Sequence, residues 1–298
     1  MKPRLAVGIA TRGRPDILAA TLGVLRMQVR QADQIFVSYA DPSDIADAPA
    51  TYPDVRFIQS SSGLTKQRNS LLNQTTDFQY ITFIDDDFWL APGYLSAVEK
   101  ILDRQPDVVV LTGTVLADGI NGSGLSFEEA RRYLEMAPSA ESELTCHPVY
   151  NAYGCNMTLR LGPVRDHALR FDEQLPLYGW YEDVDFSRRL SRFGDVVHVD
   201  QAYGVHLGVK SGRQSGLRLG YSQVANPVYL AQKGSVHWPF AIASMTSRSL
   251  KNLVFSIRPE PLIDRRGRLQ GNICAWLDLL RGMLHPTRIL QLSTTSST

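Results

Sequence analysis

The stretch "FIDDDFWLAPGYL", residues 83–95, places three consecutive aspartates directly after an apolar run and shortly before a proline and a glycine. Neighbouring carboxylates repel one another unless a cation or hydrogen-bond donors compensate their charge. Alternation along an extended chain sends Asp85 and Asp87 to one side and Asp86 to the other. The pattern therefore predicts a buried strand that ends in a pair of carboxylates suited to a divalent cation, Mn²⁺ or Mg²⁺. The alternative is a solvated turn whose aspartates cap the structure that follows.

Other short apolar runs of strand type surround this stretch and alternate with helical patterns. These runs are "RLAVGIA" at 4–10, "QIFVSYA" at 34–40, "VRFIQ" at 55–59, "YITFID" at 80–85 and "DVVVLTGTV" at 107–115. Helices are expected from Pro15 onward and over residues 63–73 and 92–103. This alternation predicts an α/β fold with a mostly parallel sheet flanked by helices. Ligands of such sheets bind at the carboxyl ends of the strands, where this chain carries "TRGRP", "ADPSD" and "DDD".

The chain changes character near residue 210. Before this point, "GCNMTLRL" at 154–161 and "DVVHVD" at 195–200 read as further strands. From Leu207 to Thr298 there are 12 Lys or Arg against 3 Asp or Glu, whereas the first 206 residues hold 19 against 27. The strand pattern and the change in charge predict an α/β domain at 1–210 and a basic helical extension at 211–298.

The amino-acid composition is typical of a folded protein, and the cysteine pattern favours a location in a reducing compartment. Hydrophobic residues make up 44% of the chain and charged residues 20%. Cys146, Cys155 and Cys274 lack CxxC spacing, so buried free thiols are expected rather than disulfides or a structural zinc site. The first apolar run is too short for a signal-peptide core, and no run approaches the roughly 18 residues needed to span a bilayer. A cytoplasmic location is expected.

With these residues in place, "FIDDD" resembles the D-x-D signature of nucleotide-sugar glycosyltransferases of the GT-A fold, especially the inverting family 2. Further segments resemble the family in the same order along the chain: "RLAVGIATRGRPDILAATLGVLRMQ" at 4–28, "SSSGLTKQRNSLLNQ" at 60–74, "GCNMTLRL" at 154–161, "RFDEQL" at 170–175 and "GWYEDVDFSRRLSRFG" at 179–194. The order and spacing of the segments make the resemblance specific. One departure is "VSYADPSD" at 37–44, where the family usually has paired acids and Gly-Ser, so either Asp41 or Asp44 takes the part of recognising the nucleotide base.

The resemblance implies a metal site and a general base. Asp87, with Asp85 nearby and His206 after the last predicted strand, matches the positions that hold a divalent metal, Mn²⁺ or Mg²⁺. Asp183, the second acid of "YED", matches the base that activates an acceptor hydroxyl, which implies inverting transfer of a hexosyl or deoxyhexosyl group. Without the resemblance, His206 reads as an ordinary loop histidine and Asp183 as an acid favoured at a helix N-terminus.

The resemblance also implies contacts with the two substrates. Expected contacts to the nucleotide-diphosphate sugar are Thr11, Arg12, Arg14, Asp41, Lys66, Arg68, Asp85 and Asp86. The basic residues among them are equally readable as surface charges. Trp180 and Glu182 are expected at the acceptor, a glycan or lipid-linked glycan of surface polysaccharide synthesis. Trp180 is also readable as a core residue.

The basic extension carries the segment "IRPEPLIDRRGRLQGNICAWLDLLRGMLHPTRIL" at 257–290. Arg265, Arg266 and Arg268 precede an apolar helical face made of Ile273, Trp276, Leu277, Leu280 and Leu284. Two interpretations stay open: a peripheral contact with an anionic membrane, at the inner face of the plasma membrane, or packing against the protein itself. Nucleic-acid binding is disfavoured, because no aromatic-interleaved basic motif is present.

Two other functions compete with sugar transfer. A sugar-phosphate nucleotidyltransferase also uses paired acids and a metal, but it is expected to have a glycine-rich basic loop after the first strand, and "TRGRP" has one glycine. A non-catalytic nucleotide-sugar or glycan-binding module on the same fold is the second alternative, because a fold does not determine a function.

Overall fold

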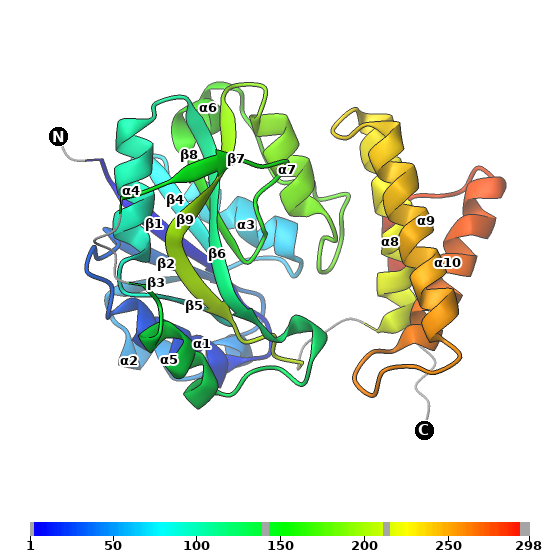
Figure 1. Ribbon diagram of the computed structural model, residues 1–298, viewed down its shortest axis with the longest axis horizontal. Coiled ribbons are helices and arrows are strands. Elements are labelled where there is room, and N and C mark those ends of the chain that lie inside the picture. Colours follow the sequence, from blue (N-terminus) through cyan, green and yellow to red (C-terminus); the bar gives the residue numbers. More distant parts are fainter. Residues whose placement is uncertain (1–2, 139–142, 211–214, 293–298) are drawn as a thin grey trace. The chain divides into compact units, whose positions relative to one another are not determined.

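The computed structural model describes residues 3–138, 143–210 and 215–292 (Figure 1). The chain forms two compact units. The first comprises Met1–Ser62, Lys66–Phe171 and Phe186–Gly212, and the second comprises Gly63–Thr65, Asp172–Asp185 and Arg213–Thr298. The domain boundary expected near residue 210 stays a prediction.

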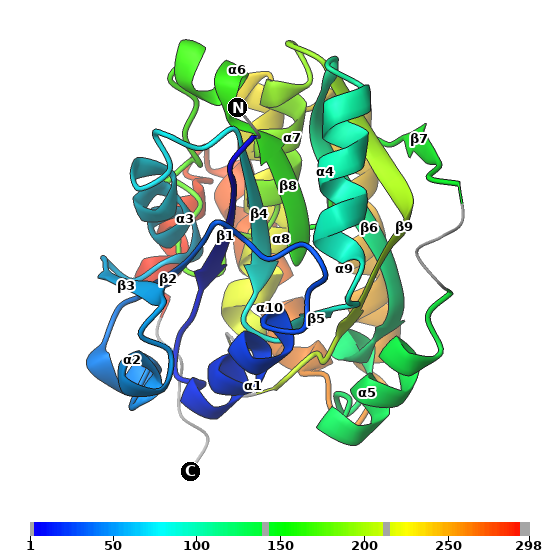
Figure 2. The ribbon, with the colours of Figure 1, turned by 90° about the vertical axis from the view of Figure 1, so that its left-hand side faces the viewer.

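A nine-stranded sheet forms the centre of the first unit over the described residues (Figure 2). Its strands are β1 (Leu5–Ala10), β2 (Gln34–Tyr39), β3 (Val55–Gln59), β4 (Tyr80–Asp85), β5 (Phe88–Leu90), β6 (Val108–Asp118), β7 (Cys146–Pro148), β8 (Asn156–Arg160) and β9 (Asp195–His206). They lie in the order β3-β2-β1-β4-β8-β6-β9-β5, and β7 pairs with β9. The α/β fold class predicted from the sequence is confirmed.

The sheet is parallel in one part and mixed in the other. The predicted parallel arrangement holds from β3 through β2 and β1 to β4. Beyond β4, strand β8 runs antiparallel to both β4 and β6, and β9 is parallel to β6 but antiparallel to β5 and β7. The sequence pattern misses this change because the direction of β8 depends on its pairing with β4 and β6, which are distant in sequence, and the helix that precedes it, α5 (Phe127–Glu135), is typical of a parallel crossover.

Helices cover both faces of the sheet, as Figure 2 shows. One face packs against α1 (Pro15–Leu25), α2 (Ala48–Thr51) and α4 (Tyr94–Arg104), and the other against α3 (Leu64–Asn73), α6 (Leu161–Asp166) and α7 (Glu182–Leu190). Strand alternation explains the two cores: Leu5, Val7 and Ile9 face the α1 side, whereas Ala6 faces the α3 side. Burial on both faces is the reason that β1 reads as a continuous apolar run.

Two predictions at this level need correction. Strand β9 does not end at Asp200 but continues to His206, because pairing with β6 resumes after an irregularity and β5 adds a second partner. The three thiols were expected to be buried, yet only Cys155 is buried, while Cys146 and Cys274 are partly exposed. Both lie on elements with one solvent-facing side, which spacing along the sequence does not reveal.

The second unit contains three longer helices: α8 (Gly216–Lys233), α9 (Trp238–Phe255) and α10 (Arg265–Leu280). Helices α8 and α10 each carry two glycines four residues apart, Gly216 and Gly220 on one and Gly267 and Gly271 on the other. A methyl group added at Gly220 would lie 2.0 Å from the Arg268 carbonyl oxygen, and one at Gly271 would lie 2.0 Å from that of Leu217. The helices therefore approach so closely that their backbones touch.

The amphipathic face expected in this unit is only partly exposed. Ile273, Leu277 and Leu280 are exposed, whereas Trp276 and Leu284 pack against the core of the unit. Arg265, expected in a basic surface cluster, is instead buried, where it pairs with Glu260 and donates a hydrogen bond to Asn252. Of the two interpretations left open for this segment, the burial of Arg265 favours packing against the protein at this residue, since a buried arginine with an acidic partner looks the same in sequence as a solvated one.

Candidate active site

The three aspartates lie where β4 ends and a tight turn leads into β5. Strand β5 pairs with β9 so that Phe88 lies opposite His206, and the Leu207 backbone N–H donates to the Asp87 carbonyl oxygen at 2.9 Å. The register of these two strands thus places His206, more than a hundred residues away in sequence, beside Asp87. Asp86 and Asp87 lie in the turn, and the alternation expected of an extended chain is nevertheless kept: Asp85 and Asp87 lie beside this histidine, whereas Asp86 is directed away from it.

Asp85, Asp87 and His206 form a compact group of ligand-type atoms. One ligand atom from each residue lies within 4.8 Å of the other two. His206 Nε2 lies 3.4 Å from Asp87 Oδ1, and Asp87 Oδ2 accepts the Val209 backbone N–H at 2.8 Å. Arg14 Nη1 adds a contact of 3.2 Å to the same carboxylate. Two carboxylates and an imidazole are a donor set that suits Mn²⁺, so the residues present fit the metal that the sequence predicts.

Asp86 is turned into the protein. Its side chain is fully buried, accepts a hydrogen bond from Thr11 Oγ1 at 2.7 Å and pairs with Arg14 at 2.5 Å. Thr21 Oγ1 donates to the Asp86 carbonyl oxygen at 2.6 Å and accepts from Trp89 Nε1 at 3.1 Å. These contacts fix the turn of the aspartate segment against β1 and α1. The predicted contacts of Thr11, Arg14 and Asp86 with the donor stay predictions.

Charges in this group are strongly coupled. Burial raises the pKa of Asp86 to about 7, although Arg14 opposes the shift. Burial also acts to raise the pKa of Asp87, but the hydrogen bond and charge of His206 outweigh it and lower that pKa to about 2. Burial would lower the pKa of His206, yet its bonds to Asp118 and Asp87 raise it to about 10. The carboxylates of Asp118 and Asp87 on either side of the ring thus favour the protonated form of His206.

Asp118 is a member of this site that the sequence reasoning missed. It ends β6, directly opposite His206 in the pairing with β9, and its Oδ1 lies 3.0 Å from His206 Nδ1. Tyr153 donates a hydrogen bond to the other oxygen at 3.0 Å. A carboxylate on the second nitrogen of a histidine fixes the orientation of the ring. The available signal was an acid at the end of a predicted strand, but the pairing of that strand with β9 could not be read from the sequence.

The basic residues expected at the donor take different positions. Arg68 is buried, donates to the Gly154 carbonyl oxygen at 2.6 Å and reaches Asp85 at 3.4 Å. It therefore holds Asp85 in place from within the first unit. Arg12 and Lys66 are exposed. The contacts of Arg12 with the nucleoside and of Lys66 or Arg68 with the diphosphate stay predictions.

Asp41 and Asp44, the alternatives for base recognition, differ in burial. Asp44 is buried, and its carboxylate accepts backbone N–H groups of Gly13, Ala40 and Asp41 at 2.7 to 3.0 Å. Asp41 is exposed and begins a short 3₁₀ helix, η1 (Pro42–Asp44), through its bond to Ser43. Asp44 thus ties "TRGRP" to the end of β2.

The residues expected at the acceptor side belong to the second unit. Helix α7 begins at Glu182, and Asp183 lies in its first turn, partly exposed, where a carboxylate is stabilised by the helix N-terminus. Glu182 is buried, whereas Trp180 is partly buried with the Arg248 guanidinium 4.8 Å from its ring centre. Asp185 is buried and bonded to Lys233 and Ser235. These contacts give Asp185 a structural role and leave Asp183 as the candidate base.

The turn before α7 has an uncommon backbone. Leu177, Gly179 and Tyr181 all have left-handed φ angles, at 62°, 65° and 71°. Side-chain-bearing residues adopt such angles at a cost and concentrate near functional sites. The turn thus fixes where α7 begins and hence where Asp183 lies.

Comparison with known proteins identifies the family. The sequence profile of glycosyl transferase family 2 matches residues 7–166, which is more than half of the chain. No curated protein sequence matches the chain at a significant level.

Several solved structures resemble the chain in fold at low sequence identity. The mannosyltransferase PcManGT from Pyrobaculum calidifontis, in complex with GDP-Man and Mn²⁺, aligns with a TM-score of 0.58 at 14% identity, covering 94% of this chain and 88% of its own. TarS 1-349 of S. aureus aligns with a TM-score of 0.56 at 15% identity, covering 96% and 82%. GalNAc-T7, with UDP, GalNAc and Mn²⁺, aligns with a TM-score of 0.59 at 12% identity, covering 97% of this chain and 56% of its own. The GT-A fold is therefore confirmed, and by its matching profile the chain belongs to glycosyl transferase family 2, whose members are glycosyltransferases.

Proposed function

We propose that the protein is an inverting, metal-dependent glycosyltransferase that uses a nucleotide-diphosphate sugar. The observation that carries this proposal is the group of Asp85, Asp87 and His206 at the carboxyl end of β4, in a chain of family 2. A ligand at that edge of an α/β sheet lies at the usual binding position. The aspartates match a D-x-D motif.

The residues divide the chemistry between them. Asp85, Asp87 and His206 would hold Mn²⁺ or Mg²⁺, which neutralises the charge that develops on the leaving diphosphate. Asp183 accepts the proton of the acceptor hydroxyl as that oxygen forms its bond to the sugar C1. The bond between C1 and the diphosphate oxygen breaks on the opposite face, so the configuration at C1 inverts. Trp180 and Glu182 are proposed to contact the acceptor, close in sequence to the base.

Donor recognition is assigned to the loops that follow β1 and β2. Thr11 and Arg12 are proposed at the nucleoside, with Arg14 and Lys66 at the diphosphate. We assign base recognition to Asp41 rather than Asp44, because backbone donors already occupy the carboxylate of Asp44. The similar structures contain GDP-Man in PcManGT and UDP-GlcNAc in TarS, which supports a nucleotide sugar without selecting the base.

The acceptor is proposed to be a glycan or lipid-linked glycan in surface polysaccharide synthesis, reached at the cytoplasmic face of a membrane. Support comes from an exposed apolar stripe on and after α9, formed by Ile242, Leu250, Leu253 and Ile257. Ile242, Leu250 and Leu253 are spaced by eight and three residues, which keeps them on one face of α9, and Ile257 follows just after the helix ends at Phe255. Lys251 and Arg258 are exposed beside the stripe, a combination suited to anionic lipid. Among the described residues no helix is long and apolar enough to cross a bilayer.

Vesicle flotation tests the membrane proposal. The protein is expected to float with vesicles that contain anionic lipid and to remain behind with neutral ones. Replacing Leu250 and Leu253 by serine should abolish flotation, whereas Val29→Ser, which removes an exposed apolar side chain of the first unit, should not. Equal recovery of the two variants with anionic vesicles would contradict the proposal.

A thermal-shift panel tests the donor proposal. The protein is heated with GDP-, UDP-, CDP- and dTDP-sugars, each with and without Mn²⁺. A cognate donor at a hundred times its dissociation constant stabilises the fold by about 2.7 kcal/mol, and this gain should require the metal. Stabilisation by nucleoside triphosphate together with a sugar phosphate, and by no nucleotide sugar, would favour the nucleotidyltransferase alternative.

A further inference from the structure

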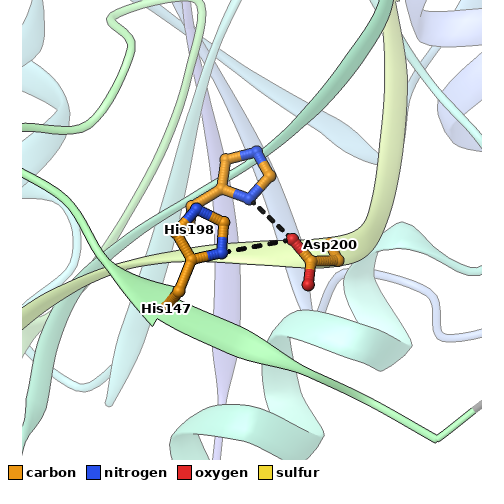
Figure 3. A group of neighbouring side chains, drawn as sticks. All are labelled: His147, His198 and Asp200. Atoms are coloured by element: carbon orange, nitrogen blue, oxygen red, sulfur yellow. Dashed lines mark hydrogen bonds and ion pairs between the residues drawn. The ribbon is translucent and has the colours of Figure 1, made fainter.

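A second group of metal-ligand side chains lies on the first unit, apart from the aspartate segment. His147 of β7 and His198 and Asp200 of β9 converge in Figure 3. The register explains the group: His147 pairs directly with His198 in the antiparallel β7–β9 ladder, so both side chains share one face. Asp200 lies two residues beyond His198, which returns it to the same face.

The distances in this group resemble those around a tetrahedral metal ion. His147 Nδ1 and His198 Nδ1 lie 3.3 Å and 3.2 Å from Asp200 Oδ1, and all three ligand atoms are within 4.8 Å of one another. Ligands at about 2.0 to 2.1 Å from Zn²⁺ in a tetrahedron are separated by about 3.3 Å. Charge-assisted hydrogen bonds are shorter, at about 2.7 to 2.9 Å. The observed separations match the spacing of ligand atoms around one tetrahedral ion and lie at the long end of the range for direct hydrogen bonds.

Neighbouring hydroxyls orient the ligands. Thr145 Oγ1 donates to Asp200 Oδ2 at 2.6 Å, which leaves Oδ1 toward the two imidazoles. Thr114 Oγ1 donates to the Asp200 carbonyl oxygen at 2.9 Å, so its contact of 3.4 Å with His198 Nε2 requires that nitrogen to be the donor. His198 Nδ1 is then the ring nitrogen that faces Asp200 Oδ1, at 3.2 Å, and is the nitrogen that can serve as a metal ligand.

This group is separate from the candidate active site. Val199, next to Asp200, and His206 lie opposite Gly113 and Asp118 of β6, which are five residues apart, so the two groups are separated by roughly 15 Å along the sheet. Cys146, the residue before His147, points to the other face and contacts Gln105. His147 is 56% exposed at its side chain, so an ion can reach the group from solvent.

We propose that His147, His198 and Asp200 bind one Zn²⁺ ion in a three-ligand site with a fourth position open to water. Two imidazoles and one carboxylate are a common zinc donor set. The ion fastens the three-residue strand β7 to β9, where few backbone hydrogen bonds are available to hold it. The proposed site does not depend on the function proposed above.

Zinc stoichiometry tests the site directly. Full-length protein without a polyhistidine tag is dialysed against Zn²⁺, and bound metal is counted. His147→Ala is expected to bind one equivalent fewer than the parent protein, and Asp200→Asn likewise. His167→Ala, which removes an exposed histidine outside both metal groups, should bind as the parent does.

Zinc affinity gives a second readout, because Thr145 orients the Asp200 carboxylate. Thr145→Ala keeps all three ligands, so its zinc stoichiometry should be unchanged while its affinity falls about ten- to a hundredfold. Zn²⁺ should also raise the melting temperature of His167→Ala more than that of His147→Ala. Equal zinc stoichiometry in His147→Ala, Asp200→Asn and the parent protein, with native circular dichroism in all three, would overturn the proposal.

Discussion

Asp118 is expected to control metal binding by His206, because it orients the imidazole ring. Asp118 holds His206 Nδ1 at 3.0 Å, which directs Nε2 toward Asp87. Asp118→Asn removes this charge but keeps the shape of the side chain. If His206 is a metal ligand, we expect Mn²⁺ affinity, measured by calorimetric titration, to fall about ten- to a hundredfold. Asp77→Asn, an exposed acid outside the site, is the matched control, and equal affinity in both variants would exclude an orienting role for Asp118.

Substitutions at Asp183 and Asp185 of α7 should affect different properties, catalysis for the first and stability for the second. Asp183→Asn is expected to lower kcat about a hundred- to ten-thousandfold with little change in donor binding, because it removes a general base. Asp185→Asn removes a buried carboxylate from Lys233 and Ser235, so it should instead lower the free energy of unfolding by about 1 to 3 kcal/mol. The measurements are initial rates with saturating donor and urea denaturation. Undiminished turnover in Asp183→Asn would show that another group is the base.

At the residue scale, alternation and family resemblance predicted which acids gather around His206. The opposite orientation of Asp86 followed from the period of an extended chain. Asp118 and the group around His147 could not be predicted in this way, because each depends on the register between distant strands. The burial of charged side chains could not be predicted from the sequence either. Arg68 and Arg265 are readable as surface charges, but both are buried.

The close packing of helices α8 and α10 leads to a prediction about stability. Their glycines allow the backbones to touch, so Gly271→Ala should force the helices apart. We expect a loss of about 1 to 3 kcal/mol in the free energy of unfolding, measured by thermal or urea denaturation.

The matched control is Gly162→Ala, because a methyl group there meets no atom within 4 Å. This helical glycine has no close neighbour, so alanine should be neutral or stabilising by up to about 1 kcal/mol. A destabilisation of equal size in the two variants would contradict the explanation by close helix packing.

Helices and strands with a clear periodicity of apolar residues could be predicted from the sequence, and the others could not. Strands β1 and β4 and helices α1, α3 and α4 follow from apolar runs, helical spacing and Pro15. Strands β5 and β7 have three residues each, too few to show any period, and both owe their existence to pairing with β9. The insertion of β8 between β4 and β6 is likewise a tertiary event, since nothing local specifies an antiparallel partner.

For the molecule as a whole, metal binding and base catalysis are assigned to different residues of the chain, and their substitution should have different effects. Loss of either should abolish transfer, but only loss of the metal ligands should also impair donor binding. Asp87→Asn should lose metal-dependent donor binding, whereas Asp183→Asn should retain it.

Metal-dependent sugar transfer can be tested by product release from a nucleotide sugar. The protein is incubated with the donor selected by the thermal-shift panel and with Mn²⁺, and the nucleotide products are separated and identified. We expect slow release of nucleoside diphosphate by the parent protein, and loss of this release with a chelator and in Asp87→Asn. Equal release of nucleoside diphosphate with a chelator present, or in Asp87→Asn, would contradict this expectation.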